Sequence, residues 1–160
     1  MPDPSLDQNA RGPGVPIPPP LIYLAFFLLG IALGWVFPLP SIESRSGEFF
    51  GGVVAFASLL VAGFGFKELR AAHTTFRPDR PTSSLVTAGI FNFSRNPLYL
   101  SLLLLYAGVS FVLQAWWAII LTPLLLAAMN RYVVAREERY LERRFGAQYS
   151  DYCKRVRRWL

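Results

Sequence analysis

Two adjacent glutamates, Glu137 and Glu138, follow the longest uncharged stretch of the chain and are its clearest candidates for binding chemistry. On a helix, a side chain pairs with residues three or four positions away, and neither glutamate has a basic residue at those positions. A carboxylate at the edge of an apolar segment then needs water, a distant arginine or a bound cation. A solvated helix end is the alternative interpretation.

The second candidate is Arg95-Asn96-Pro97, which stands where the same uncharged stretch begins. In the plain interpretation Pro97 opens a helix, Asn96 caps it, and Arg95 reaches phospholipid phosphates. In the functional interpretation, the N–H groups of the helix start also bind an anion such as an amino-acid carboxylate.

The elements that must position these residues are expected to be membrane helices. The chain has 160 residues, of which 53% are hydrophobic, and is too apolar for an ordinary soluble domain. Residues 12–42, 49–66 and 96–130 carry no charge, and the last stretch is long enough for two short spans, divided near Trp116 and Trp117. We therefore predict an all-α, polytopic membrane bundle with about four transmembrane helices, at about residues 21–37, 49–66, 97–113 and 116–134.

The remaining segments complete the expected organisation. Residues 1–20 contain seven prolines and are predicted to be a disordered arm, so that residues 21–160 form the domain. After the last span, residues 135–160 are expected to be cytosolic helices. Their aromatic and apolar residues recur every three or four positions, which fits either an amphipathic helix on anionic lipid or a helix packed on the cytosolic cap.

The basic residues predict the orientation of the chain. Of the 16 Lys and Arg residues, five lie between Lys67 and Arg95 and nine lie from Arg131 onward. Basic residues collect on the cytoplasmic side, so both termini are expected there, in an integral protein of a bacterial inner membrane. The net charge of +6 is thus attributed to topology and lipid contact and not to nucleic acid. A lone His73 and a lone Cys153 do not predict a metal site.

Four segments together resemble the isoprenylcysteine carboxyl methyltransferase family and its phospholipid methyltransferase relatives. They are residues 85–91, 94–100, 137–138 and 145–156, in the family's order and with roughly its spacing. The resemblance covers about residues 76–159. It implies a small integral membrane enzyme that uses S-adenosylmethionine, with a cytosolic cofactor-binding cap.

The resemblance also implies site residues. Residues 84–86 would surround the adenosine, residues 96–99 match the family's Arg-His-Pro-x-Tyr cofactor motif, and one glutamate would hold the methionine portion. Asn96 replaces a histidine and Phe91 replaces a tyrosine, which removes a titratable group and a hydroxyl. The implied cofactor-binding residues are Ser84, Leu85, Val86, Gly89, Phe91, Asn96, Pro97, Leu98, Tyr99, Glu137 and Glu138. Arg95, Asn96 and Tyr99 would position the reactants, and Arg131 or Arg136 would bind the substrate.

The expected reaction is methyl transfer to a hydrophobic or amphiphilic acceptor such as an isoprenylcysteine carboxylate. A phospholipid amine is the alternative acceptor, and a non-catalytic lipid-binding or assembly module is the alternative function. The acceptor, the atom that is methylated and the oligomeric state are left open. Methyl transfer needs alignment and a dry site more than a catalytic nucleophile, which agrees with a chain that has no catalytic triad or metal motif.

The two glutamates are expected to have different roles, because neighbours on a helix point about 100° apart. Glu138 has Glu142 one turn beyond it and lies on the more charged face. We therefore assign Glu137 to the cofactor ammonium and Glu138 to a cytosolic arginine such as Arg95 or Arg77.

Overall fold

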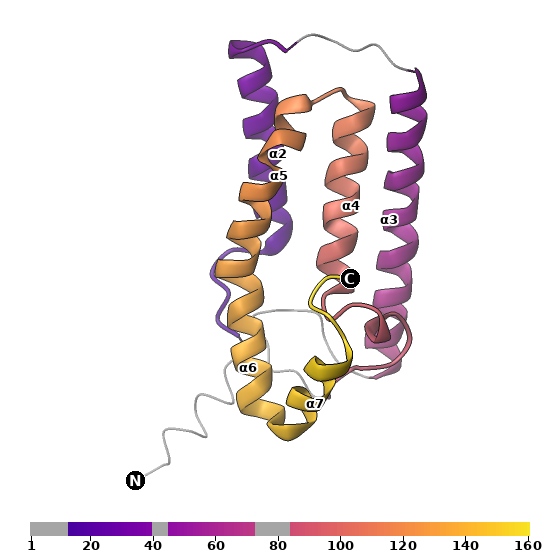
Figure 1. Cartoon of the computed structure of the whole chain (residues 1–160), viewed down its shortest axis with the longest axis vertical. Coiled ribbons are helices and arrows are strands. Elements are labelled where there is room, and N and C mark those ends of the chain that lie inside the picture. The colour runs from indigo at the N-terminus through magenta and orange to yellow at the C-terminus, as the bar shows by residue number, and fades with distance from the viewer. Residues whose placement is uncertain (1–12, 40–44, 73–83) are drawn as a thin grey trace.

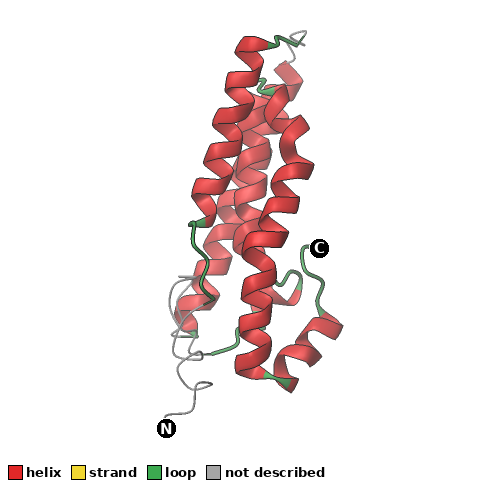
Figure 2. Cartoon of the chain, turned by 90° about the vertical axis from the view of Figure 1, so that its left-hand side faces the viewer, coloured by secondary structure: helices red, strands yellow, loops and turns green. Residues whose placement is uncertain are grey.

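The computed structural model describes residues 13–39, 45–72 and 84–160, and all regular secondary structure within them is helical (Figures 1 and 2). The prediction of an all-α bundle is confirmed. The elements are α2 (Pro19–Val36), α3 (Arg45–Ala71), the short 3-10 helix η1 (Gly89–Asn92), α4 (Pro97–Val112), α5 (Trp116–Met129), the π-helix η2 (Asn130–Val134), α6 (Ala135–Phe145) and α7 (Ala147–Arg155).

The long helices α2, α3, α4 and α5 run side by side along the length of the molecule (Figure 1). Within the described residues, three helices are long and apolar enough to cross a membrane: Pro19–Val36, Arg45–Ala71 and the continuous helix Trp116–Phe145, which combines α5, η2 and α6. A shorter apolar helix, Pro97–Val112, is the fourth. The protein is therefore an integral membrane protein, in agreement with about four spans. Helix α3 and the helix Trp116–Phe145 extend beyond the predicted limits, because charged residues end an apolar run without ending a helix.

Helices α3 and α4 approach each other closely at two glycines, Gly51 and Gly108. A Cβ atom on Gly51 would lie 2.7 Å from the carbonyl oxygen of Gly108, and one on Gly108 would lie 2.6 Å from the backbone nitrogen of Ala55. Small residues allow such backbone contact between helices in a membrane. This contact fixes α4 and, with it, the segment that precedes its first turn.

Replacing Gly51 by alanine is expected to destabilise the bundle by about 1–3 kcal/mol, because the added methyl group meets backbone atoms that cannot move alone. Gly52→Ala is the matched control. A Cβ atom on Gly52 would meet no atom within 4 Å, so alanine there should stabilise the helix by about 0.5–1 kcal/mol. Thermal unfolding in detergent, followed by circular dichroism, compares the two variants. Equal midpoints would contradict the close packing of α3 on α4.

On the other side of α4, two buried tyrosines join the helices through backbone carbonyls. The Tyr23 hydroxyl of α2 donates to the carbonyl of Tyr99 at 3.1 Å, and the Tyr106 hydroxyl donates to the carbonyl of Ala118 at 2.6 Å. These residues belong to the main apolar core, which also contains Met129. The start of α4 is therefore held by α2 as well as by α3.

The segment expected to be a disordered arm, residues 1–20, overlaps the first described helix at its end. Residues 1–12 lie outside the described part, but α2 already begins at Pro19, and Val15 packs against the main core. A proline fits the first turn of a helix because its missing N–H group has no partner there anyway. The prolines thus start the helix and do not keep the whole segment away from the core.

The apolar side of α7 packs on the cap, which the loop before α4 and the end of α6 form, and this contact distinguishes the two interpretations of the C-terminal helix. Tyr149, Tyr152 and Val156 are buried and contact Leu85 and Leu141, among others. Of the two interpretations, the structure supports packing on protein, because the loop before α4 and the end of α6 cover these side chains. Burial raises the pKa of the Tyr149 and Tyr152 hydroxyls.

Candidate functional site

Glu137 and Tyr99 form the centre of the candidate site. Tyr99 lies in the first turn of α4 and Glu137 in the first turn of α6, and the Tyr99 hydroxyl donates a hydrogen bond to Oε1 of Glu137 at 2.5 Å. Tyr99 is only 2% exposed, and its carbonyl accepts the bond from Tyr23. Three helices therefore converge on this carboxylate, which stands one turn beyond the apolar core residue Val133.

Glu138 has different partners, as the angle between neighbouring helical residues requires. Arg158 donates to both of its oxygens, from Nε at 3.0 Å and from Nη2 at 2.6 Å, and Arg95 lies 3.2 Å from Oε1. Such two-point contacts between guanidinium and carboxylate are strong and geometrically specific. They raise the pKa of the Arg158 guanidinium above its usual value. Arg95 is one of the two arginines expected to contact Glu138; the other, Arg77, lies outside the described residues.

The C-terminal strap, which we define as residues 156–160, binds the loop in front of α4. The Asn96 side-chain amide donates to the carbonyl of Arg158 at 2.9 Å, and the backbone N–H of Arg95 donates to the carbonyl of Arg157 at 3.0 Å. Asn96 occupies the N-cap position, but its side chain makes no capping hydrogen bond. The expected capping bond is therefore wrong, because the strap takes the amide instead.

Arg95 points into the cap and not toward lipid phosphates. In addition to Glu138, its Nη1 atom contacts the Tyr149 hydroxyl at 3.5 Å and the sulfur of Cys153. Only 15% of its side chain is exposed. The interpretation in which Arg95 reaches the membrane surface is thus wrong, and Arg95 instead joins α4, α6 and α7.

The loop proposed for adenosine connects α3 to α7. The Ser84 hydroxyl donates to the carbonyl of Ala72 at the end of α3 at 3.0 Å, and the carbonyl of buried Phe91 accepts a 2.6 Å bond from Tyr152. Gly89 has φ +58, and a Cβ atom there would lie 2.3 Å from the Glu68 carboxylate. The positive φ angle strongly favours glycine at that turn. Glu68 was not singled out from the sequence, because it follows an apolar span without any motif.

The two arginines assigned to the substrate do not meet the Glu137–Tyr99 pair through any contact within the described residues. Arg131 is exposed on η2, and Arg136 donates to the carbonyl of Gly14 at 3.0 Å. Arg136 therefore ties α6 to the segment in front of α2. Both arginines are exposed.

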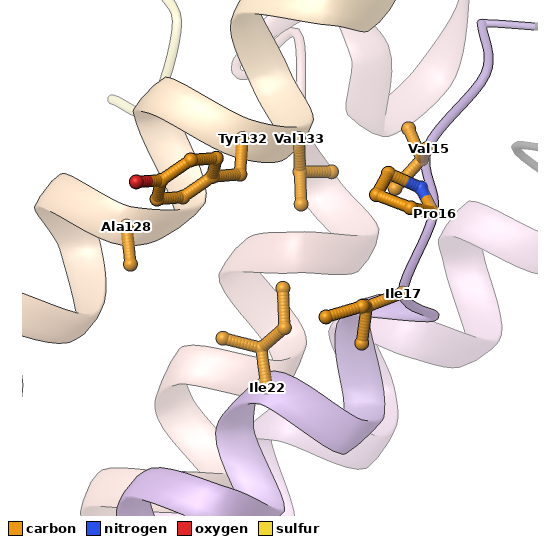
Figure 3. A pocket seen from close by; sticks show the side chains of 7 residues that line it. All are labelled: Val15, Pro16, Ile17, Ile22, Ala128, Tyr132 and Val133. Atoms are coloured by element: carbon orange, nitrogen blue, oxygen red, sulfur yellow. The ribbon is translucent and has the colours of Figure 1, made fainter.

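An apolar cavity of about 190 Å³ lies between the segment in front of α2 and the helix that carries Glu137 (Figure 3). Its lining contains no charged side chain. Sequence reasoning missed the cavity, since three of its seven lining residues come from the segment expected to be disordered. The residues that line it are Val15, Pro16, Ile17, Ile22, Ala128, Tyr132 and Val133. Val133 connects the two features, because it lines the cavity and precedes Glu137 by one helical turn.

Comparison with known proteins identifies a family and a relative. The family model described as phospholipid methyltransferase matches residues 48–148, a range that includes Tyr99, Glu137 and Glu138. An uncharacterised protein of Haemophilus influenzae is 42% identical over 66 residues, which cover 39% of this chain and 100% of that protein. No solved structure matches the chain.

Proposed function

This chain belongs to the phospholipid methyltransferase family, and from that premise we propose that it transfers a methyl group from S-adenosylmethionine to a hydrophobic or amphiphilic acceptor. The observation that carries the proposal is the Glu137 carboxylate, which Tyr99 holds at the end of a membrane helix, one turn from an apolar cavity. A carboxylate placed in this way suits a cationic group, and the cavity suits a hydrocarbon.

The residues present fit the chemistry of the cofactor. Glu137 would bind the ammonium of the methionine portion, and the N–H groups at the start of α4 would favour its carboxylate. Residues 84–91 would surround the adenosine, with Gly89 shaping the turn and Phe91 supplying a buried ring. When bound, S-adenosylmethionine supplies a methyl group on a positively charged sulfur.

The chain's own contribution would be alignment and the exclusion of water. Tyr99 orients the Glu137 carboxylate, while Glu138, Arg158 and Arg95 hold α4 and α6 at a fixed separation. Positioning of two reactants contributes up to about 7–11 kcal/mol to a displacement reaction. A site without a nucleophilic side chain or metal is sufficient for this role.

The apolar cavity supports the proposal of a hydrophobic acceptor. A dry cavity of about 150 Å³ holds benzene in another protein, so about 190 Å³ holds a ring or a short hydrocarbon segment. The exposed Arg131 and Arg136 would attract an acidic group on the same molecule. An amphiphile such as an isoprenylcysteine carboxylate fits this description, and a phospholipid amine remains the alternative.

Titration of the purified protein with S-adenosylhomocysteine in several detergents and lipid mixtures tests the proposal. Saturable binding, followed by methylation of S-farnesylcysteine analogues or of phosphatidylethanolamine with labelled S-adenosylmethionine, would support it and identify the acceptor. No binding by a folded sample in any of these conditions would exclude it. A lipid-binding or assembly module would then be the better interpretation.

Filling the cavity is expected to affect the acceptor and not the cofactor. Ala128→Phe places a ring in the cavity and should raise KM for the acceptor identified in that screen roughly tenfold, which corresponds to about 1.4 kcal/mol of lost contact. Binding of S-adenosylhomocysteine should be unchanged. Ala127→Phe is the matched control, since Ala127 is exposed on the same helix and does not line the cavity. Equal KM values in both variants would remove the cavity from the acceptor site.

The distribution of basic residues supports an orientation with both termini and the cofactor site in the cytoplasm. In a Cys153→Ser background, Ser44→Cys should react with an impermeant thiol reagent added outside, and Ser83→Cys should not. The reverse pattern would place the site away from cytosolic S-adenosylmethionine and would contradict the proposed function as well.

A further inference from the structure

The helix that carries Glu137 changes its winding immediately before the candidate site. Asn130–Val134 form a π-helix between α5 and α6, and the N–H of Ala135 bonds to the carbonyl of Asn130, five residues back. The helix nevertheless continues without a break from α5 into α6 (Figure 1). A π-turn holds one residue more than an α-turn in the same place. Each residue after η2 therefore occupies the place that the preceding residue would occupy in an uninterrupted α-helix. The π-turn thus rotates each of these side chains by about 100° around the helix axis.

This extra residue decides which side chain faces Tyr99. If the segment were α-helical and α5 and α6 kept their places, Arg136 would stand where Glu137 stands now. Glu137 would then stand where Glu138 stands, opposite Arg158 and Arg95. A cation would face Tyr99, and the site would lose its carboxylate. The division of roles between the two glutamates thus depends on the π-turn.

The C-terminal strap reaches this π-turn. Nε1 of Trp159 donates to Oδ1 of Asn130, the first residue of η2, at 3.2 Å, and Trp159 packs against the main core. The strap is itself anchored by the bonds from Arg95 and Asn96 to its backbone carbonyls, and it ends close to the lower end of α4 (Figure 1). A π-turn is rare and persists where tertiary contacts favour it over the α-helix.

We propose that Asn130 and Trp159 are positioning residues, which hold the π-turn and so place the Glu137 carboxylate against Tyr99. This inference rests on the proposed function to the extent that cofactor affinity reports the position of Glu137. Neither residue is required to touch the cofactor. The C-terminal strap would thereby contribute to cofactor binding indirectly, through the position of Glu137.

Cofactor affinity provides the first test. Trp159→Phe removes the donor but keeps a ring, and Asn130→Ala removes the acceptor; each should raise the Kd for S-adenosylhomocysteine about tenfold. Asn130→Asp keeps an acceptor oxygen and should remain within about threefold of the parent. Unchanged affinity in Trp159→Phe and Asn130→Ala would overturn the proposal. An equal loss in Asn130→Ala and Asn130→Asp would overturn it too.

A deletion separates positioning from a merely structural role. Removing Arg131 takes one residue out of η2, so that an uninterrupted α-helix keeps both glutamates in their present places. In this background Trp159→Phe should change the Kd less than twofold, because there is no π-turn left to hold. The same tenfold loss in both backgrounds would show that Trp159 acts in another way. If the deletion variant does not fold, the three Asn130 and Trp159 variants decide alone.

A register measurement without cofactor distinguishes a failure of this inference from a failure of the proposed function. In a Cys153→Ser background, Arg158→Cys is combined with either Glu138→Cys or Glu137→Cys, and a short bifunctional thiol reagent is added. The pair at 138 and 158 should be bridged in the parent. With Asn130→Ala added, bridging should move to the pair at 137 and 158. Bridging that stays at 138 overturns the proposal whether or not the protein binds S-adenosylhomocysteine.

Discussion

Glu137→Gln is expected to raise the Kd for S-adenosylhomocysteine by about one to two orders of magnitude while the fold remains intact. A hydrogen bond to a charged group contributes about 1.5–3 kcal/mol, and the substitution removes the charge that would hold the ammonium. Tyr99 can still donate to the amide oxygen of glutamine, so its contact with α6 is retained. Isothermal titration calorimetry in detergent, with circular dichroism on the same samples, measures both properties.

Glu142→Gln is the matched control for this substitution, because Glu142 is exposed on the same helix and has no assigned role in binding. It should bind the cofactor like the parent. A larger loss of affinity in Glu138→Gln than in Glu137→Gln would exchange the two assignments. Affinities equal to the parent in both variants would show that the pair is a solvated helix end.

Glu138→Gln is expected to lower the free energy of unfolding by about 1–3 kcal/mol, with a smaller effect on cofactor affinity than Glu137→Gln. Glu138 joins two arginines from different parts of the chain, and its neutralisation leaves both guanidinium groups close together without a counter-charge. The side chains of Arg95 and Glu138 are 15% and 18% exposed, whereas that of Arg158 is 41% exposed. Solvent around Arg158 therefore keeps the effect below that of a fully buried pair.

Unfolding by heat or denaturant in detergent micelles measures this loss, and Asp151→Asn provides its control. Asp151 and Lys154 also form an ion pair, but their side chains are 66% and 72% exposed. An exposed pair contributes little, so Asp151→Asn should leave the unfolding midpoint unchanged. A midpoint for Glu138→Gln equal to that of the parent would mean that Arg95 and Arg158 hold the cap through their other contacts alone.

The sequence by itself determined the helical class and the number of apolar helices. These features depend on local properties, such as the length of an uncharged stretch or a proline in the first turn. Pro97 begins α4 as expected, and the pattern of the charged residues distinguished Glu138 from Glu137. The predicted helix ends were less accurate than the predicted helices themselves. Arg45, Lys67 and Arg70 end an apolar run, but these residue types are compatible with a helix.

Only the tertiary structure decided which distant residues meet. Glu138 pairs with Arg158, twenty residues along the chain, and Tyr99 pairs with Glu137; no helical spacing reports such contacts. The sequence also left open whether the apolar stripe of the C-terminal helix contacts protein or lipid, since both contacts require the same apolar residues. The π-turn at Asn130 has no distinct residue preference either. Its position depends on tertiary contacts such as the one between Trp159 and Asn130. Those contacts form only when segments that are distant in the sequence come together.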